Sequence, residues 1–509
     1  MRGRTAVPPI CQTHTMRTTS LTHAHHPTPP RWQFWILLAL LAGIGLFWSL
    51  TLRQGHVWGG DFSLYIRHAL NLLQGIPYGE SGYILNPADP VVSPQAYPPV
   101  FPLLLLPALA LFGFNLTALK MVVVVCFVLF LAVYAALLRR DLPFSHLCAV
   151  ILVLGLNPFF WDFKDDVRSD IPFLLFTYIA LVQIYHLAPE KRQGRQAILP
   201  AVTTGLVMYL AYGTRTLGIV LPACLLLLDL LQWRKITLFT LLAGIVFGLG
   251  VGGQSLFFPG NGYWQQYVFD PTTNALNVAG YLISLSTLWE NGYSNALLLI
   301  VSIVTLSLAV TAVWTRLRAR LTILELYLLA YVLVLAVWPV SQGIRFLIPV
   351  LPLYLFYVFA GVGQLAARLP GKWGGGLFWG VTAVIFLSSA ARYTTLPFDA
   401  IPTGIGRAES VALFEYVRAE TAETDVLIFR KPRVLALYTG RSSAIFHPEQ
   451  SGEAEQWAFW REIAATHLIV ANWDEAHWQQ FIAEHQALLE PVYANADFRV
   501  YRLARWPEE

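Results

Sequence analysis

Long apolar runs separated by short polar loops make up most of this chain. A run of about 20 apolar residues can cross a bilayer as one α-helix, because each residue advances the helix by about 1.5 Å. Of the 509 residues, 56% are hydrophobic and 13% are charged, whereas soluble domains carry about 25% charged residues. The sequence therefore predicts a polytopic α-helical membrane protein, and no nucleic-acid partner is expected.

The apolar runs place about 11 transmembrane helices. One further apolar segment, 97–114, is excluded because Pro98, Pro99, Pro102 and Pro107 remove backbone donors and break a straight helix. We expect that segment to lie at the outer surface as an interfacial or re-entrant element. The expected spans are 33–52, 117–138, 144–160, 171–187, 197–213, 216–232, 236–257, 294–314, 321–339, 346–363 and 375–391.

Basic residues gather in alternate loops and indicate the orientation. With the spans above, every basic cluster falls on the side of the N-terminus, and the positive-inside rule assigns that side to the cytoplasm. An odd number of spans then places the C-terminus outside. We expect a multi-pass plasma-membrane protein with an extracytoplasmic C-terminal domain. The clusters are Arg139/Arg140, Lys191/Arg192/Arg195, Arg234/Lys235, Arg316/Arg318/Arg320 and Arg368/Lys372.

Three regions differ in composition. Residues 1–32 are polar and rich in His, Thr and Pro, which predicts a disordered cytoplasmic tail in which Met16 is an alternative start. Residues 33–391 contain the spans and form the expected transmembrane domain. Residues 392–509 carry about half of the acidic residues. The four cysteines show no disulfide framework and no metal-ligand spacing.

The C-terminal region has the pattern of a small α/β domain. Amphipathic stretches at 409–420 and 474–488 alternate with short β-rich runs at 426–429, 467–470 and 498–501. Because the last span ends on the outer side, we expect this domain to lie on the outer face of the membrane.

Nearly all the remaining charges lie at the outer ends of the spans. Each has an explanation without function: an aspartate before a helix can cap it, and arginines near helix ends extend to lipid headgroups. Together they indicate a site in which arginines bind phosphate and a carboxylate acts as a base or a metal ligand. These residues are Asp61 in the first outer loop, Asp165, Asp166, Arg168 and Asp170 in the second, and Arg215 and Arg345 in later loops.

The first outer loop resembles that of the GT-C superfamily of glycosyltransferases. The resemblance rests on Asp61, on Tyr65, Ala69, Gly75 and Pro77-Tyr78 after it, and on Tyr97-Pro98-Pro99. The stretch from Arg345 to Pro352 is similar to the late R-Y-x-x-P-x-x-P stretch of that family. The likeness covers roughly residues 33–509 and is nearest to Rgt-like bacterial enzymes, relatives of protein mannosyltransferases and aminoarabinose lipid A transferases.

The resemblance implies an inverting transferase that uses a polyprenyl-phosphate-linked sugar at the outer face of the membrane. Asp61 matches the first-loop aspartate of the family and would be the general base. Arg345 matches the arginine of the late stretch and would bind the lipid phosphate, and we expect Arg215 and Arg168 to bind it too. The acceptor class stays open between a lipid, a glycan and a protein.

One position departs from the mannosyltransferase pattern. Phe62 follows Asp61 where those enzymes carry a second acid. A second acid would then come from Asp165, Asp166 or Asp170, and the use of a divalent metal stays open.

Aromatic side chains in the outer loops are candidates for a wall that holds the sugar or the acceptor. Aromatic faces suit the C–H surfaces of sugars, although membrane-interface belts use the same residues. The candidates are Tyr65, Tyr97, Tyr263 and Trp264.

Two other classes of function remain open. A transporter or flippase for lipid-linked sugars would place its charges near the bilayer midplane, whereas the charges here lie at the outer ends of the spans. A non-catalytic scaffold that binds a partner through its C-terminal domain would not need Asp61 or Arg345.

Overall fold

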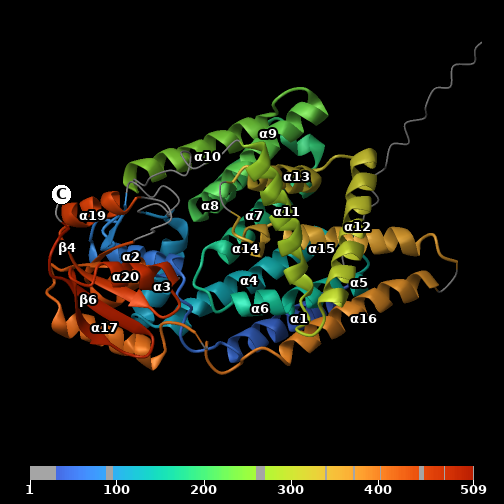
Figure 1. Ribbon diagram of the computed structural model, residues 1–509. Coiled ribbons are helices and arrows are strands. Elements are labelled where there is room, and N and C mark those ends of the chain that lie inside the picture. The colour runs from blue at the N-terminus through green and yellow to red at the C-terminus, as the bar shows by residue number, and fades with distance from the viewer. Residues whose placement is uncertain are drawn as a thin grey trace, which may run out of the picture.

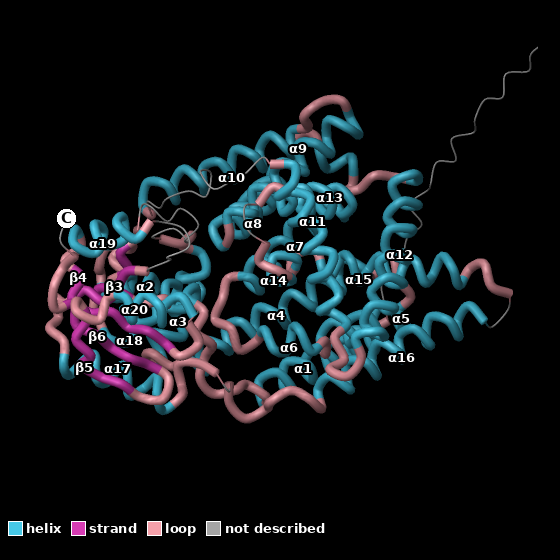
Figure 2. The backbone as a smooth tube through the Cα atoms, viewed as in Figure 1, coloured by secondary structure: helices cyan, strands magenta, loops and turns pink. Residues whose placement is uncertain are grey.

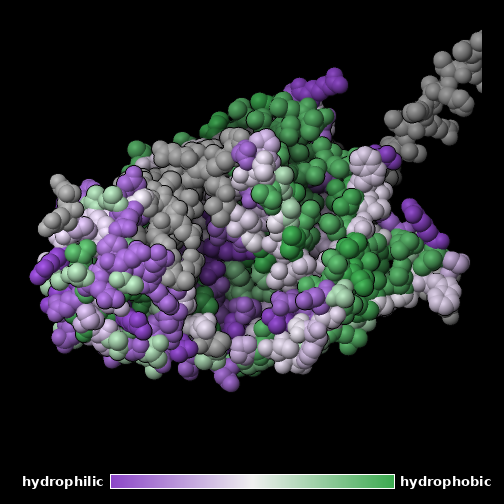
Figure 3. Space-filling view, in the orientation of Figure 1, coloured by the Kyte–Doolittle hydropathy of each residue, from purple (hydrophilic) through white to green (hydrophobic). Residues whose placement is uncertain are grey.

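The computed structural model consists of a helical body with a sheet-containing domain at one end (Figure 1). It describes residues 30–86, 96–258, 270–338, 341–370, 373–401, 403–445, 452–474 and 476–507. The polar tail with Met16, and the predicted wall residues Tyr263 and Trp264, lie outside the described residues. In the space-filling view, hydrophobic side chains cover much of the helical body and hydrophilic ones dominate the C-terminal domain (Figure 3).

Seven of the described helices are long and apolar enough to cross a membrane, which confirms an α-helical membrane protein. Two of them, α8 and α9, reach that length through the 3-10 turns η2 (Arg195–Ala197) and η3 (Thr216–Ile219). The helices are α1 (Arg31–Leu50), α4 (Leu116–Leu138), α8 (Ile198–Thr214), α9 (Val220–Trp233), α10 (Leu238–Phe257), α12 (Asn295–Ala319) and α16 (Trp373–Tyr393).

Shorter apolar helices account for the other expected spans. Four of them overlap predicted spans: α5 (Phe144–Gly155), α7 (Asp170–His186), α13 (Ile323–Ala336) and α15 (Leu351–Ala366). The fifth, α3 (Val100–Phe112), is the proline-rich segment expected not to cross, and it has 13 residues with Pro107 inside. How many helices cross the bilayer stays a prediction.

Other short helices connect these segments. They are α2 (Gly60–Gln74), α6 (Pro158–Phe163), η1 (Pro189–Arg192), α11 (Pro271–Leu285), η5 (Ser286–Trp289) and α14 (Ile344–Leu347). Gly75 follows the last residue of α2, and its φ of 70° is the left-handed conformation that glycine adopts at low cost.

Helix α4 is central to the body and packs against α1, α3, α5 and α7. Trp48 of α1 stacks on Phe127 of α4 with ring centroids 4.0 Å apart, and its indole N–H donates to the Gly155 carbonyl at 2.9 Å. A Cβ at Gly155 would lie 2.5 Å from Cδ1 of Ile44. The glycine therefore permits the close approach of α1 and α5, and this packing fixes the base of the first outer loop.

The C-terminal domain contains a six-stranded mixed sheet of order β1-β3-β2-β4-β6-β5. The first three neighbouring pairs are parallel and the last two are antiparallel. Figure 2 shows the strands gathered at one end of the molecule. The strands are β1 (Tyr83–Ile84), β2 (Val426–Ile428), β3 (Ser442–Ala444), β4 (Ala465–Ala471), β5 (Leu489–Ala494) and β6 (Phe498–Leu503); the helices are α17 (Ala408–Glu420), α18 (Pro432–Thr439), α19 (Glu453–Glu462) and α20 (Ala476–Glu484). The predicted small α/β domain is confirmed.

One strand of this sheet comes from the first outer loop. Tyr83 and Ile84 pair with Ser443 and Ala444, and the Ser443 amide donates to the Gly82 carbonyl at 2.8 Å. Helix α2 also packs against α18. The loop that carries Asp61 is therefore joined to the C-terminal domain by both backbone pairing and helix packing.

Gly82 tests this junction, because its φ is +71° and an added Cβ would lie 3.1 Å from Cβ of Ala436. We expect Gly82→Val to destabilise the docked C-terminal domain by about 1–3 kcal/mol, through backbone strain and the close contact. Hydrogen exchange at residues 432–444 should become faster. Gly79→Val is the matched control, because nothing lies within 4 Å of its Cβ position. Equal exchange in the two variants would contradict the importance of this junction.

Candidate active site

Asp61 lies in the first turn of α2 and its carboxylate faces two partners. Oδ2 lies 2.6 Å from Nη2 of Arg345, and Oδ1 accepts a hydrogen bond from the Tyr97 hydroxyl at 2.7 Å. The cap position of this helix is Gly59, and no side chain caps it. The alternative explanation of Asp61 as a helix cap is therefore not supported, because its oxygens are directed to Arg345 and Tyr97 instead of to the backbone of α2.

Arg345 joins Asp61 to a second carboxylate, that of Asp170. Its Nε lies 3.2 Å from Oδ2 of Asp170, which is 1% exposed at the start of α7. Arg215, the residue after α8, also forms an ion pair with Asp170. Both arginines thus pair with carboxylates of the protein, whereas the sequence also allowed them to extend to lipid headgroups. The structure thus brings four of the predicted site residues into one network, from α2, α7, α14 and the end of α8.

Tyr65 and Tyr97 form a stacked pair beside this network, with ring centroids 4.7 Å apart. The Tyr65 hydroxyl shares a hydrogen bond of 2.7 Å with Ser169. Both tyrosines are buried, and their expected role as a wall for the sugar or the acceptor stays a prediction.

His68 sets the position of Tyr97. The Tyr97 amide donates to Nε2 at 3.2 Å, so Nδ1 carries the proton and donates to the Tyr78 carbonyl at 2.8 Å. Burial lowers the pKa of His68 to about 3, which keeps the imidazole neutral at neutral pH. The Tyr78 hydroxyl returns to the Tyr97 carbonyl at 2.8 Å. These bonds connect the Pro77-Tyr78 and Tyr97-Pro98 stretches of the sequence.

Arg433, in the first turn of α18, reaches the site from the C-terminal domain. Its Nη1 donates to the Tyr97 hydroxyl at 3.1 Å and lies 4.0 Å from Oδ1 of Asp61. The guanidinium lies 4.6 Å from the Tyr83 ring centroid and 5.6 Å from that of Tyr97. Sequence reasoning missed this residue. The one available signal was the basic run Arg430, Lys431, Arg433 in an otherwise acidic domain.

The surrounding cations keep Asp61 ionised. Burial alone would raise the pKa of this carboxyl, but Arg345 and Arg168, together with the Tyr97 hydroxyl and Arg433, hold it well below its usual value. Arg168 lies beside the start of α2, where its Nη2 would be 2.6 Å from a Cβ at Gly59. Asp166 lies 3.5 Å from Arg168 and 3.7 Å from His56. It therefore pairs with Arg168, the arginine next to Asp61, and not with Asp61 itself.

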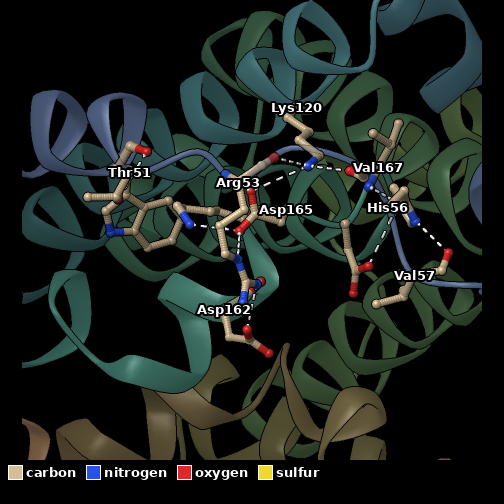
Figure 4. Close-up of polar contacts among 12 residues, drawn as sticks. Thr51, Arg53, His56, Val57, Lys120, Asp162, Asp165 and Val167 are labelled. Atoms are coloured by element: carbon tan, nitrogen blue, oxygen red, sulfur yellow. Dashed lines mark hydrogen bonds and ion pairs between the residues drawn. The ribbon is translucent and has the colours of Figure 1, made fainter. Parts of the chain in front are cut away.

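Asp165 lies in a separate buried cluster (Figure 4). It accepts from the backbone amide and Nε of Arg53 at 3.0 and 2.7 Å, and from Lys164 at 2.8 Å, while Lys120 lies 3.5 Å away. Lys120 also donates to the Arg53 carbonyl at 2.7 Å. Asp165 is 1% exposed. The structure therefore does not bring it to Asp61 as a second acid; it holds the first outer loop to the second.

No family model matches the chain, and no curated protein matches it in sequence. Solved structures do match. ArnT from Cupriavidus metallidurans bound to undecaprenyl phosphate is 14% identical, with a TM-score of 0.59 over 93% of this chain and 98% of that one. The Archaeoglobus fulgidus oligosaccharyltransferase in its apo form is 13% identical, with a TM-score of 0.59 over 86% of this chain and 70% of that one. The same organism's AglB in complex with an inhibitory peptide and a dolichol-phosphate is 12% identical, with a TM-score of 0.57.

The chain has the GT-C fold. The candidate site lies where the helical body meets the C-terminal domain, and hydrophilic side chains lie in a hollow between the two parts (Figure 3).

A divalent metal needs several carboxylate or imidazole ligands directed at one point. Asp61 and Asp170 are the two carboxylates in the network, and the guanidinium of Arg345 already bridges them. Among the described residues there is no group of three His, Cys, Asp or Glu side chains that could hold a metal ion. The carboxylates of Asp61 and Asp170 therefore do not fit a divalent metal.

The Asp165 cluster makes a stability prediction that separates it from the site. Asp165→Asn would leave Arg53, Lys120 and Lys164 buried without their shared counter-charge, so we expect a loss of about 3–5 kcal/mol in thermal unfolding of the detergent-solubilised protein. Burial alone would raise the pKa of Asp165, but Lys164 and Lys120 hold it below its usual value. Its contribution to stability should therefore be lost only as the pH falls through that lowered pKa.

Asp162→Asn is the matched control, because the Asp162 side chain is 56% exposed and pairs with the same Arg53 at 2.6 Å. We expect a change of about 1 kcal/mol or less. An equal loss in both variants would show that the buried cluster is not what stabilises the loops.

Proposed function

We propose that this chain transfers a sugar from a polyprenyl-phosphate-linked donor to an acceptor at the outer face of the membrane. The observation that carries the proposal is the position of Asp61 between the Tyr97 hydroxyl and the Arg345 guanidinium, within a network that includes Arg215. The GT-C fold supports it, since similar structures were solved with undecaprenyl phosphate and with a dolichol-phosphate. In this proposal the N-terminus is cytoplasmic and the C-terminal domain lies outside.

Asp61 is the proposed general base. The acceptor hydroxyl attacks the anomeric carbon of the sugar and gives its proton to the Asp61 carboxylate. The bond from the anomeric carbon to the phosphate oxygen breaks on the opposite face, its electron pair leaves with the phosphate, and the configuration inverts. The depressed pKa of Asp61 ensures that the carboxylate is ionised before the reaction begins.

Arg345 and Arg215 are the proposed ligands of the donor phosphate. Both pair with Asp170, which orients them toward the same region. Two forked guanidinium groups can bind phosphate oxygens and stabilise the charge that develops on the leaving group. A phosphate bound by Arg345 would compete with Asp61 for that guanidinium, so donor binding would raise the basicity of Asp61 when the base is needed.

Tyr97 and Arg433 are the proposed positioning groups on the other side of Asp61. Tyr97 donates to the carboxylate, and Arg433 donates to Tyr97 while stacked near two tyrosine rings. This arrangement fixes the direction in which the free lone pairs of Asp61 point. The C-terminal domain thereby takes part in the proposed reaction.

Asp61→Asn is the direct test of the base. The amide keeps an oxygen acceptor for Tyr97 but cannot take the proton, so we expect release of polyprenyl phosphate to slow by about 10²- to 10⁴-fold. Affinity for undecaprenyl phosphate should stay the same or increase, because Arg345 loses a competing carboxylate. A damaged site would instead lose both rate and affinity. Transfer at the wild-type rate would refute the base assignment.

Arg433→Gln tests the contribution of the C-terminal domain. Because Tyr97 and Asp61 lose a positioning contact, we expect transfer to slow by roughly 10- to 100-fold, with little change in affinity for undecaprenyl phosphate. Arg433 lowers the pKa of Asp61. Its removal raises that pKa, so the acid limb of the pH–rate profile should move to higher pH.

Arg499→Gln is the control for this variant, because it removes the same charge from an exposed position on β6 of the same domain. We expect it to leave both the rate and the pH profile unchanged. Equal behaviour of the two variants would show that Arg433 does not position the site.

A further inference from the structure

A second polar cavity of about 1240 Å³ lies at the opposite ends of the helices that form the candidate site. Helix α7 begins with Asp170 in the site and ends with His186 in the wall of this cavity. Its 17 residues separate the two places by about 25 Å. Helix α8 runs the other way, from Pro200 at the cavity toward Arg215 at the site. The cavity is therefore distinct from the site.

The walls of this cavity are strongly basic. They come from the ends of α4, α7, α9 and α12, from η1, and from the starts of α8 and α13, and a single carboxylate, that of Asp141, lines them. The cationic residues in the lining are Arg139, Arg140, Lys191, Arg192, Arg316 and Arg320.

Two of these cations are already paired. Arg192 is buried and lies 3.0 Å from Asp229, and Arg316 lies 2.8 Å from Glu325 and 3.4 Å from Asp141. These pairs connect η1 to α9 and α12 to α13 in the lining of the cavity.

The other four cations are exposed, and none forms a salt bridge within the part of the chain that the structure describes. They are Arg139, Arg140, Lys191 and Arg320. Six cations line the cavity. The carboxylates of Asp141, Asp229 and Glu325 offset only part of this charge, so a surplus of positive charge remains. The positive-inside rule accounts for basic residues on this side, but it does not account for their convergence on one concave surface.

Apolar side chains complete the lining. Leu187, Leu228 and Ile323 lie between the basic groups, and Trp233 is 42% exposed at the end of α9. A small soluble anion would need only the cations. A surface that combines cations with an apolar wall suits a molecule with a phosphate at one end and an acyl chain at the other.

We propose that this cavity binds the phosphate headgroup of an anionic phospholipid from the leaflet opposite the candidate site. Basic pockets between transmembrane helices on the cytoplasmic side are known to take such headgroups. The exposed cations would contact the phosphate, and the apolar wall at Trp233 would contact the first part of an acyl chain. No step of the proposed transfer uses this cavity, so the inference does not depend on it.

Native mass spectrometry of the delipidated full chain in detergent tests the proposal. The probes are phosphatidylglycerol, phosphatidylcholine with the same acyl chains, and glycerol phosphate as a soluble source of the same phosphate group. We expect the first phosphatidylglycerol to bind at least about tenfold more tightly than phosphatidylcholine, and an excess of glycerol phosphate not to displace it.

The triple variant Arg139→Gln, Arg140→Gln, Arg320→Gln should lose about tenfold in affinity for phosphatidylglycerol. The matched triple Arg195→Gln, Lys235→Gln, Arg368→Gln removes the same charge from exposed positions outside the cavity lining, and should change the affinity by less than about twofold. Thermal unfolding of both triples checks that they fold. Equal binding of the two lipids, equal losses in the two triples, or displacement by glycerol phosphate would overturn the proposal.

Discussion

The guanidinium of Arg345 connects the elements that make up the candidate site. It lies between the carboxylates of Asp61 and Asp170, and Asp170 also pairs with Arg215. Without this group, two carboxylates of partly buried side chains would face one another, which is costly. The ion pairs thereby bring the first outer loop, the start of α7, the end of α8 and the late loop to one place.

A second set of contacts places the C-terminal domain against this network. Strand β1 adds the first outer loop to the edge of the sheet, and α18 packs on α2. Arg433 enters between Tyr83 and Tyr97 as a consequence of that docking. Asp61 is thus approached by Arg345 from the helical body and by Arg433 from the C-terminal domain. We infer that the chemistry depends on both parts being docked together.

Much of the helical body could be predicted from the sequence, whereas the contribution of the C-terminal domain to the site could not. Long apolar runs predict membrane-spanning helices directly. Loops expected on the same side of a membrane lie at a similar depth, which is why Asp61, Asp170, Arg215 and Arg345 could be expected to meet. Arg433 lies 336 positions after Tyr97 and follows no periodic pattern. A two-residue strand such as β1 is too short to show alternation.

The role of the individual aspartates was harder to predict than their depth. Asp165 and Asp170 lie five positions apart in one outer loop, yet Asp165 is directed into a cluster with Arg53 and Lys164 while Asp170 is directed to Arg345. Which cation an acid meets depends on the turn between α6 and α7 and on the packing of α1, and neither can be read from charge alone. The alternative of a helix cap at Asp61 fails for a related reason, because tertiary partners compete with the local backbone for its oxygens.

Reaction of the purified wild-type protein with a panel of polyprenyl-phosphate-linked sugars tests the central claim most directly. The quantities to measure are the polyprenyl phosphate released and the configuration of the anomeric carbon in the product. We expect release coupled one to one with transfer, and an inverted product. Movement of intact donor across a vesicle membrane without release of polyprenyl phosphate would contradict it and would identify a flippase.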